Sequence, residues 1–285
     1  MSDPYDLETG PDPATLAAAE PEPDGTPEAD GAVSDESATG PTDPGVPPVY
    51  AVGIGPGNPE YLTPRARRAV READVVVGFE TVRSFLTDAM SVDAEVLSCG
   101  YRDEADTLAA FADRVADGAA GTAVLMGDPN HSGYQFVGKV QSAVDRPVRV
   151  IPGISSLQIA ASRARTPMEA TTFVTLHKSG DVDEDLARLR DDVGDRHLLV
   201  LPRPFDLMPE DVAADLLETA DADPSLEALV LERLTHPDEQ ITRTTLGELA
   251  AARTDGSAAS ETGEEGSATS TFSDLSVLVV RAPIG

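Results

Sequence analysis

Residues 49–60 read VYAVGIGPGNPE. An apolar, β-branched run changes abruptly into a loop of glycine and proline, a pattern typical of a strand that leads into a ligand-facing turn. Gly53, Gly55 and Gly57 permit a positive φ or a close approach of the backbone to a ligand, and Pro56 stiffens the loop between them. We therefore expect a strand followed by a binding loop, with room beside its glycines for a bound molecule.

This loop is similar to the dinucleotide-binding pattern G-x-G-x-x-G but does not match it. Its third glycine comes one position early, and Asn58 stands where that glycine belongs. The next helix begins only at Thr63 and Pro64, so no helix N-terminus lies directly after the glycines to bind a pyrophosphate. A nicotinamide-dependent oxidoreductase, which the glycines alone would indicate, is therefore disfavoured.

The composition excludes several classes of function. The 285 residues are enough for one large or two medium domains, and the net charge of −30 argues against binding to nucleic acid or anionic membranes. Only Lys139 and Lys178 are lysines, which indicates adaptation to a high-salt (halophilic) cytoplasm; an ordinary acidic protein with a disordered tail is the alternative. No apolar window spans a bilayer and Cys99 is the single cysteine, so we expect a soluble cytoplasmic protein without a disulfide or metal site.

Short apolar strands alternate with helices, which predicts an α/β fold of two domains. We expect a disordered acidic extension at 1–48, domains at 49–166 and 167–285, and a flexible insert at 254–271. After the opening strand, predicted strands cover 74–78, 95–97, 122–126, 148–151, 171–177, 197–201, 226–232, 239–243 and 276–281. Predicted helices begin at 63 and cover 106–117, 134–143, 157–164, 183–193, 209–219 and 246–251.

Three predicted strands of the first domain end in turns rich in glycine or serine, at 53–57, 127–133 and 152–156. Ligands of open α/β sheets bind at the carboxyl ends of the strands. We therefore expect the three turns to meet at one edge of the sheet and to form a site.

Few side chains in these turns show a recognisable catalytic pattern. The sequence contains no nucleophile elbow, no H-E-x-x-H and no Cys/His cluster. His131 and His177 each follow a predicted strand and are candidates for proton transfer. Asp128 is expected either to make a turn or to accept a hydrogen bond from a ligand, and Ser155 and Ser156 either to cap a helix or to bind a ligand. Arginines elsewhere could bind carboxylates of an acidic substrate: Arg102, Arg163, Arg203, Arg233 and Arg243.

Three motifs follow one another along the chain: VGIGPGNPEYLT at 52–63, GDP at 127–129 and PGISS at 152–156. In this order and at these spacings they resemble the tetrapyrrole methylase family, whose enzymes use S-adenosylmethionine on precursors of cobalamin and sirohaem. The resemblance covers about residues 49–282.

Within that family, the chain is most similar to enzymes that methylate C5 of cobalt-precorrin-7. The similarity is carried by ISSLQIAASR at 154–163, by Leu176 and His177, and by PDEQITRTTL at 237–246. Thr244 stands where that subfamily has a small glycine, and Lys178 follows His177 where Gly-Arg is usual, which leaves the role of His177 open. Methylation at C11, C17 or C20 is an alternative, as are a diphthine synthase-like methylase and a non-catalytic binding protein of this fold.

The resemblance implies two α/β domains with a cleft between them, a homodimer, and S-adenosylmethionine bound in the cleft. It also implies a cobalt-precorrin substrate, whose many carboxylates make Arg102, Arg163 and Arg243 plausible anchors. The cofactor contacts carried over by motif, the last two by a gapped comparison, are Gly55, Pro56, Gly57, Gly127, Asp128, Pro129, Ser132, Gly133, Ser155, Ser156, Pro202 and Leu234.

Overall fold

The computed structural model describes residues 47–90, 92–100, 102–178, 180–253 and 270–283. Residues 1–46 of the predicted extension and 254–269 of the predicted insert lie outside the described residues. Contacts divide the chain into two compact units. Unit 1 contains the described part of Met1–Gly53, with Pro64–Leu125 and Gly133–Pro152, and unit 2 contains Ile54–Thr63, Met126–Ser132 and the described part of Gly153–Gly285.

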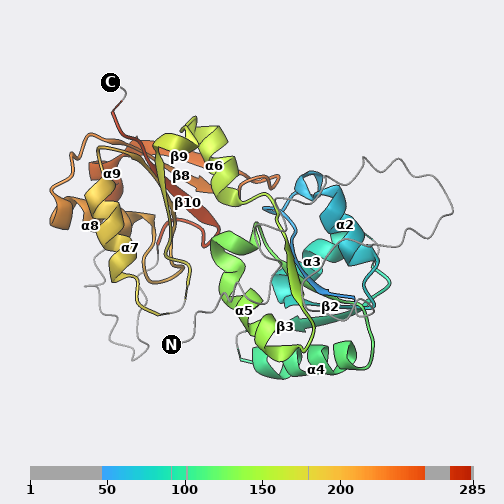
Figure 1. The fold of residues 1–285 in the computed structure, drawn as a ribbon. Helices are drawn as coiled ribbons and strands as arrows, with labels where there is room; N and C mark the ends of the chain where they lie inside the picture. The colour runs from blue at the N-terminus through green and yellow to red at the C-terminus, as the bar shows by residue number, and fades with distance from the viewer. Residues whose placement is uncertain (1–46, 91, 101, 179, 254–269, 284–285) are drawn as a thin grey trace, which may run out of the picture. The chain divides into compact units, whose positions relative to one another are not determined.

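Unit 1 is built on a parallel sheet with the strand order β3-β2-β4-β1-β5. The central strands are buried on both faces, which explains why they appear in the sequence as continuous apolar runs. Figure 1 shows α2 and α3 on one face of this sheet and α4 and α5 on the other. The elements are β1 Val49–Gly53, α2 Pro64–Arg71, β2 Val75–Phe79, α3 Glu80–Ala89, β3 Glu95–Cys99, α4 Glu104–Ala116, β4 Gly121–Leu125, α5 Tyr134–Ala143 and β5 Val148–Ile151.

Unit 2 is built on a mixed sheet with the order β6-β7-β10-β8-β9, in which only β6 and β7 are parallel. Helices α7, α8 and α9 pack on one face, and α6 packs on the other through Leu157 and Ala160, against Leu199 and Leu231 of the sheet (Figure 1). The elements are α6 Ser156–Ala164, β6 Thr171–Thr175, α7 Asp183–Asp192, β7 His197–Leu201, α8 Pro209–Ala220, β8 Glu227–Glu232, β9 Gln240–Thr245, α9 Leu246–Ala251 and β10 Ser276–Val280. Short helical turns are η2 Pro59–Tyr61, η3 Pro129–Gly133 and η4 Met168–Ala170.

The fold class expected from the sequence is confirmed, because both sheets carry helices on their faces. Every predicted strand and helix is present within a few residues of its predicted bounds, and β8 pairs with β9 in an antiparallel arrangement. Helix α3 was not predicted, although Val82, Phe85 and Leu86 recur at helical spacing and are buried. Helix α6 precedes the predicted domain boundary near Thr166 and yet packs on the second sheet.

In the described part of the chain, no helix has both the length and the apolar character needed to cross a membrane.

Candidate functional site

The three turns predicted to meet do so, because strand β1 lies between β4 and β5 and all three run parallel. The loops after β1 and β4 are joined directly by two backbone hydrogen bonds. The N–H of Gly55 donates to the carbonyl of Gly127 over 3.2 Å, and the N–H of Gly127 donates back to Gly55 over 2.8 Å. The first two turns therefore form one hydrogen-bonded structure.

Asp128 connects the second turn to the third. Its carboxylate is buried, and Oδ2 accepts the N–H of Gly153 at 2.9 Å. The other oxygen, Oδ1, accepts the N–H of Asn130 at 2.8 Å within its own turn. Each carboxylate oxygen thus accepts one backbone N–H. Asp128 therefore stabilises its own turn, as the sequence suggested, and also fixes the neighbouring loop.

His131 lies inside η3, a turn of π-helix that includes Pro129, Ser132 and Gly133. π-Helical turns are rare and occur frequently at functional sites. The Nδ1 atom of His131 is buried and lacks a hydrogen-bond partner among the described residues, since Oδ1 of Asp128 is 3.9 Å away. An imidazole nitrogen in this situation is available to a ligand.

Ser155 and Ser156 have different roles at the start of α6. Ser155 is the N-cap: its hydroxyl accepts the N–H of Leu157 at 3.2 Å, and the side chain of Gln158 accepts the N–H of Ser155 at 2.8 Å. Ser156 is half-buried and is not needed for this cap. The capping alternative is therefore confirmed for Ser155.

The glycine loop, residues 54–57 after β1, belongs to unit 2 and packs against other residues of that unit. Gly55 and Gly57 have φ values of +85° and +130°, which require glycine. A Cβ on Gly57 would lie 2.1 Å from Nε2 of His236, and a Cβ on Gly55 would lie 3.1 Å from the carbonyl oxygen of Tyr61. His236 therefore fills the space on the side of Gly57 where a Cβ would point. Pro56, between the two glycines, is half-buried.

The two positions inferred from a gapped comparison lie at strand ends of unit 2. Pro202 is buried directly after β7, and Leu234 is buried two residues after β8. Arg233 and Thr235, on either side of Leu234, have φ values of +46° and +71°. A β-branched residue such as Thr235 rarely adopts this conformation, and such strain accumulates at binding sites.

The second histidine, His177, follows β6 and has a solvent-exposed side chain. Desolvation by neighbouring atoms lowers its pKa from the ordinary value, and the carboxylate of Asp274 opposes this shift. The described contacts do not bring it together with His131.

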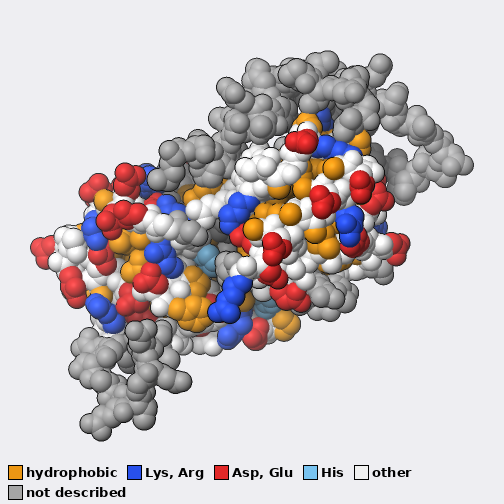
Figure 2. All heavy atoms as spheres, turned by 90° about the horizontal axis from the view of Figure 1, so that it is seen from below, with side chains coloured by type: hydrophobic (Ala, Val, Ile, Leu, Met, Phe, Trp, Pro, Cys, Tyr) orange, Lys and Arg blue, Asp and Glu red, His pale blue; other side chains and the backbone are white. Residues whose placement is uncertain are grey.

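The three predicted arginine anchors occupy separate places. Arg102 is exposed between β3 and α4 in unit 1. Arg163 on α6 donates from Nε to Glu239 at 2.8 Å, and Arg243 on the edge strand β9 donates from Nε to Glu227 at 2.5 Å. Figure 2 shows acidic side chains interspersed with lysine and arginine side chains over one face of the molecule.

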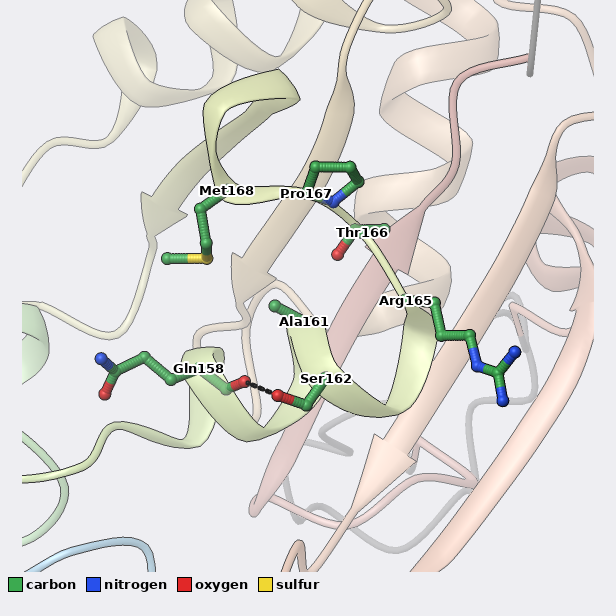
Figure 3. A pocket seen from close by; sticks show the side chains of 7 residues that line it. All are labelled: Gln158, Ala161, Ser162, Arg165, Thr166, Pro167 and Met168. Carbon is green, nitrogen blue, oxygen red and sulfur yellow. Dashed lines mark hydrogen bonds between the residues drawn. The ribbon is translucent and has the colours of Figure 1, made fainter.

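A hollow of about 440 Å³ lies along the C-terminal half of α6. In Figure 3 the side chains of Gln158 and Met168 extend to one side of this segment and Arg165 extends to the other. None of the predicted cofactor residues lines the hollow. Its lining residues are Gln158, Ala161, Ser162, Arg165, Thr166, Pro167 and Met168.

The described residues contain no group of three or more His, Cys, Asp or Glu side chains that could hold a metal ion. What the site offers is backbone N–H and C=O groups, serine hydroxyls and buried apolar residues.

Comparison with known proteins agrees with this fold and with these loops. The family model for Tetrapyrrole (Corrin/Porphyrin) Methylases matches residues 48–250. A probable cobalt-precorrin-7 C(5)-methyltransferase from Methanocaldococcus jannaschii is 30% identical over 203 residues, which cover 71% of this chain and 91% of that protein.

Among solved structures, a cobalt precorrin-4 methyltransferase superposes with a TM-score of 0.60 at 20% identity, covering 82% of this chain and 94% of the other. A uroporphyrin-III C-methyl transferase from Thermus thermophilus, solved in complex with S-adenosylhomocysteine, gives 0.60 at 22% identity, covering 82% and 92%. At these identities the structures support the fold alone. Since the family model covers well over half of the sequence, and includes all three turns, the chain belongs to the tetrapyrrole (corrin/porphyrin) methylases.

Proposed function

We propose that this tetrapyrrole methyltransferase transfers a methyl group from S-adenosylmethionine to C5 of cobalt-precorrin-7 in cobalamin biosynthesis. The observation that carries the proposal is the similarity to the Methanocaldococcus jannaschii protein, which extends over 91% of that relative. The cofactor is supported by the donor set of the three turns and by the Thermus thermophilus relative that binds S-adenosylhomocysteine.

The methyl donor is proposed to contact the joined loops and the two strand ends. The backbone groups of the turns suit the polar methionine part, and the buried Pro202 and Leu234 suit the adenine ring. The residues assigned to this contact are Gly55, Pro56, Gly57, Gly127, Asp128, Pro129, Ser132, Gly133, Ser155, Ser156, Pro202 and Leu234.

S-Adenosylmethionine supplies a methyl group already activated by the sulfonium. An electron-rich ring carbon forms the new C–C bond as the S–CH₃ bond breaks, and the electron pair of that bond remains on sulfur. The protein then contributes mainly alignment, which supplies about 7–11 kcal/mol of a barrier. We propose His131 or His177 as the group that exchanges a proton with the tetrapyrrole ring. Nδ1 of His131 is buried and lacks a hydrogen-bond partner among the described residues.

Arg102 and Arg243 are proposed to bind carboxylates of the cobalt-precorrin. Arg243 suits this role because 68% of its side chain surface is exposed even with Glu227 bound. Arg163 is less suitable, since its guanidinium already binds Glu239 and it is 38% exposed. We also expect a homodimer located in the cytoplasm and adapted to high salt, and light scattering of the purified protein tests the dimer.

The test is incubation of the purified protein with cobalt-precorrin-7 and methyl-labelled S-adenosylmethionine, followed by mass spectrometry of the product. One added methyl group, located at C5 by NMR, is the expected result. Parallel reactions contain cobalt-precorrin-4 and uroporphyrinogen III, the substrates suggested by the other relatives. Labelling of one of these, with none of cobalt-precorrin-7, would overturn the proposal and assign a different ring position.

A further inference from the structure

The segment 233–239, between β8 and β9, makes contacts that the proposed methyl transfer does not by itself explain. Its backbone forms two successive turns, in which the N–H of His236 donates to Arg233 and the N–H of Glu239 donates to His236, each over 3.0 Å. The strained residues Arg233 and Thr235 lie in the first turn, on either side of Leu234. Contacts beyond these two backbone hydrogen bonds must hold this strained conformation.

The carbonyl of Leu275 accepts the N–H of Arg233 over 2.9 Å, and a second hold comes from Glu239. Its Oε2 accepts the N–H of the strained Thr235 at 2.7 Å, so the carboxylate closes the turn from one side. From the other side, the guanidinium of Arg163 donates two hydrogen bonds to Glu239, at 2.8 Å from Nε and 3.4 Å from Nη2. The hydrogen bond from Arg163 is the main reason that the pKa of Glu239 is lowered.

The ion pair of Arg163 and Glu239 also lies near the glycine loop. Tyr61, shortly after that loop, lies near enough to Arg163 to contribute, after Glu239, to raising its pKa. His236, inside the turns that Glu239 closes, fills the space beside Gly57. Arg163 on α6 is 76 residues from Glu239 in sequence, so this contact joins three separate segments of unit 2.

We propose that Arg163 and Glu239 are positioning residues for the methyl-donor site: their ion pair fixes the 233–236 turn, and thereby Leu234 and His236, against the glycine loop. The inference rests on the proposed function, because it assumes that Leu234 and the glycine loop contact S-adenosylmethionine. It gives Arg163 a task different from binding substrate carboxylates.

Binding of S-adenosylhomocysteine, measured by isothermal titration calorimetry, tests this pair. In Glu239→Gln one of the two acceptor oxygens becomes an amide nitrogen and the negative charge is lost, so the side chain can no longer accept from both Arg163 and Thr235. The turn should then leave its bound conformation for most of the time. If the competent fraction falls to about a tenth, the Kd rises about tenfold. The KM for S-adenosylmethionine should rise in step, while kcat at saturating donor stays near that of the unaltered protein.

The matched control is Glu95→Gln, since Glu95 forms a nearly identical pair with Arg114, at 2.9 Å from Nε and 3.2 Å from Nη2, on the edge strand of unit 1. This variant loses a similar ion pair and should bind S-adenosylhomocysteine as the unaltered protein does. Arg163→Lys, which keeps the charge but loses the two-pronged geometry, should raise the Kd by about threefold. If Glu239→Gln does not fold, the affinity of Arg163→Lys for S-adenosylhomocysteine tests the positioning role instead.

The outcomes separate the two proposals. If the unaltered protein fails to bind S-adenosylhomocysteine, the proposed function is overturned. If it binds, and Glu239→Gln and Arg163→Lys bind equally well, only the positioning role is overturned. An equal loss of affinity in Glu95→Gln also overturns it, because the effect would then be one of general stability.

Discussion

The carboxylate of Asp128 accepts the backbone N–H of Gly153 at 2.9 Å, a bond between residues 25 apart in sequence that ties the turn after β4 to the turn after β5. With Gly55 and Gly127 hydrogen-bonded to each other, all three turns become one connected structure. The geometry of the candidate site is thus set mainly by backbone, and Asp128 is the side chain that links its parts.

Replacing Asp128 by alanine should weaken both folding and binding. Two backbone N–H groups lose a charged acceptor, and hydrogen bonds to charged groups contribute about 1.5–3 kcal/mol each, so we expect a loss of about 3–6 kcal/mol in unfolding free energy. Urea denaturation measures the loss, and calorimetry with S-adenosylhomocysteine should show weaker binding.

Asp223→Ala is the control for Asp128. Asp223 accepts the N–H of Ser225 at 2.8 Å in a similar local turn, but it is exposed, and among the described residues its carboxylate bonds only to Ser225. We expect a smaller loss of stability and unchanged binding. If the two variants lose the same stability, the bond from Asp128 to Gly153 has no special importance.

The sequence predicted the position of the site better than its internal contacts. The turns at 53–57, 127–133 and 152–156 follow apolar runs, and parallel strands bring such turns to one edge, so their meeting was predictable. The role of His236 beside Gly57 was not predictable, because the two residues are far apart in sequence and only the packing of unit 2 brings them together.

The strand order of unit 2 also could not be predicted from the sequence. Residues 276–281 were predicted to form a strand, but the central position of β10, between β7 and β8, was not predicted. Its five buried residues agree with a central position, yet an apolar run has the same appearance wherever both faces are covered. The pairing of Arg163 with Glu239 escaped prediction for a related reason, since sequence does not show which way an arginine points.

Cys99 should be unreactive in the folded protein. The thiol is buried and donates to the carbonyl of Gly78 over 3.6 Å, and desolvation, together with the negative charges of Glu104 and Asp103, raises its pKa to about 11. At pH 8 almost no thiolate is present, so Ellman's reagent should react only after urea unfolds the chain. Rapid labelling without denaturant would contradict the burial of this residue.

Salt should stabilise the protein strongly. A net charge of −30 creates repulsion that unfolding relieves, and raising the salt from 0.1 M to 1 M shortens the screening length from about 10 Å to about 3 Å. We expect the melting temperature to rise steadily with potassium chloride up to molar concentrations. A melting temperature that is flat or falls over this range would contradict the proposed high-salt adaptation; sulfate is avoided because it also strengthens apolar burial.

Acid should destabilise the protein partly through His197. Its Nδ1 accepts the N–H of Ala282 at 3.0 Å, and desolvation, followed by the charge of Arg281, lowers its pKa below the ordinary 6.5. The unfolded chain therefore binds this proton more readily than the folded one. The stabilisation is complete above about pH 6.5 and is lost as the pH falls through the lowered pKa of the folded state.

The variant His197→Asn isolates this effect, because its amide oxygen can replace Nδ1 as an acceptor but does not titrate. Urea denaturation at pH 7.5 and pH 5.5 should show a smaller drop in unfolding free energy for the variant than for the unaltered protein. Equal drops would assign the acid sensitivity to other groups, such as His177 or the carboxylates.

Gly57 and His236 provide a test of the glycine loop that needs no ligand. Gly57→Ala places a Cβ 2.1 Å from Nε2 of His236 at a φ of +130°, so it combines a clash with backbone strain. Overpacking of this kind costs about 1–3 kcal/mol, and the strain adds about 1–2 kcal/mol. Gly118→Ala has a φ of +109° with open space around the new Cβ, and so measures the strain alone.

A double-mutant cycle with His236→Ala separates the two costs. Removing the imidazole should make Gly57→Ala less destabilising by about 1 kcal/mol or more, since only the strain then remains. Denaturation of the four proteins in the cycle gives the interaction energy directly. An interaction energy near zero would mean that His236 does not lie against Gly57 in solution, and the contact between the glycine loop and the 233–239 segment would have to be abandoned.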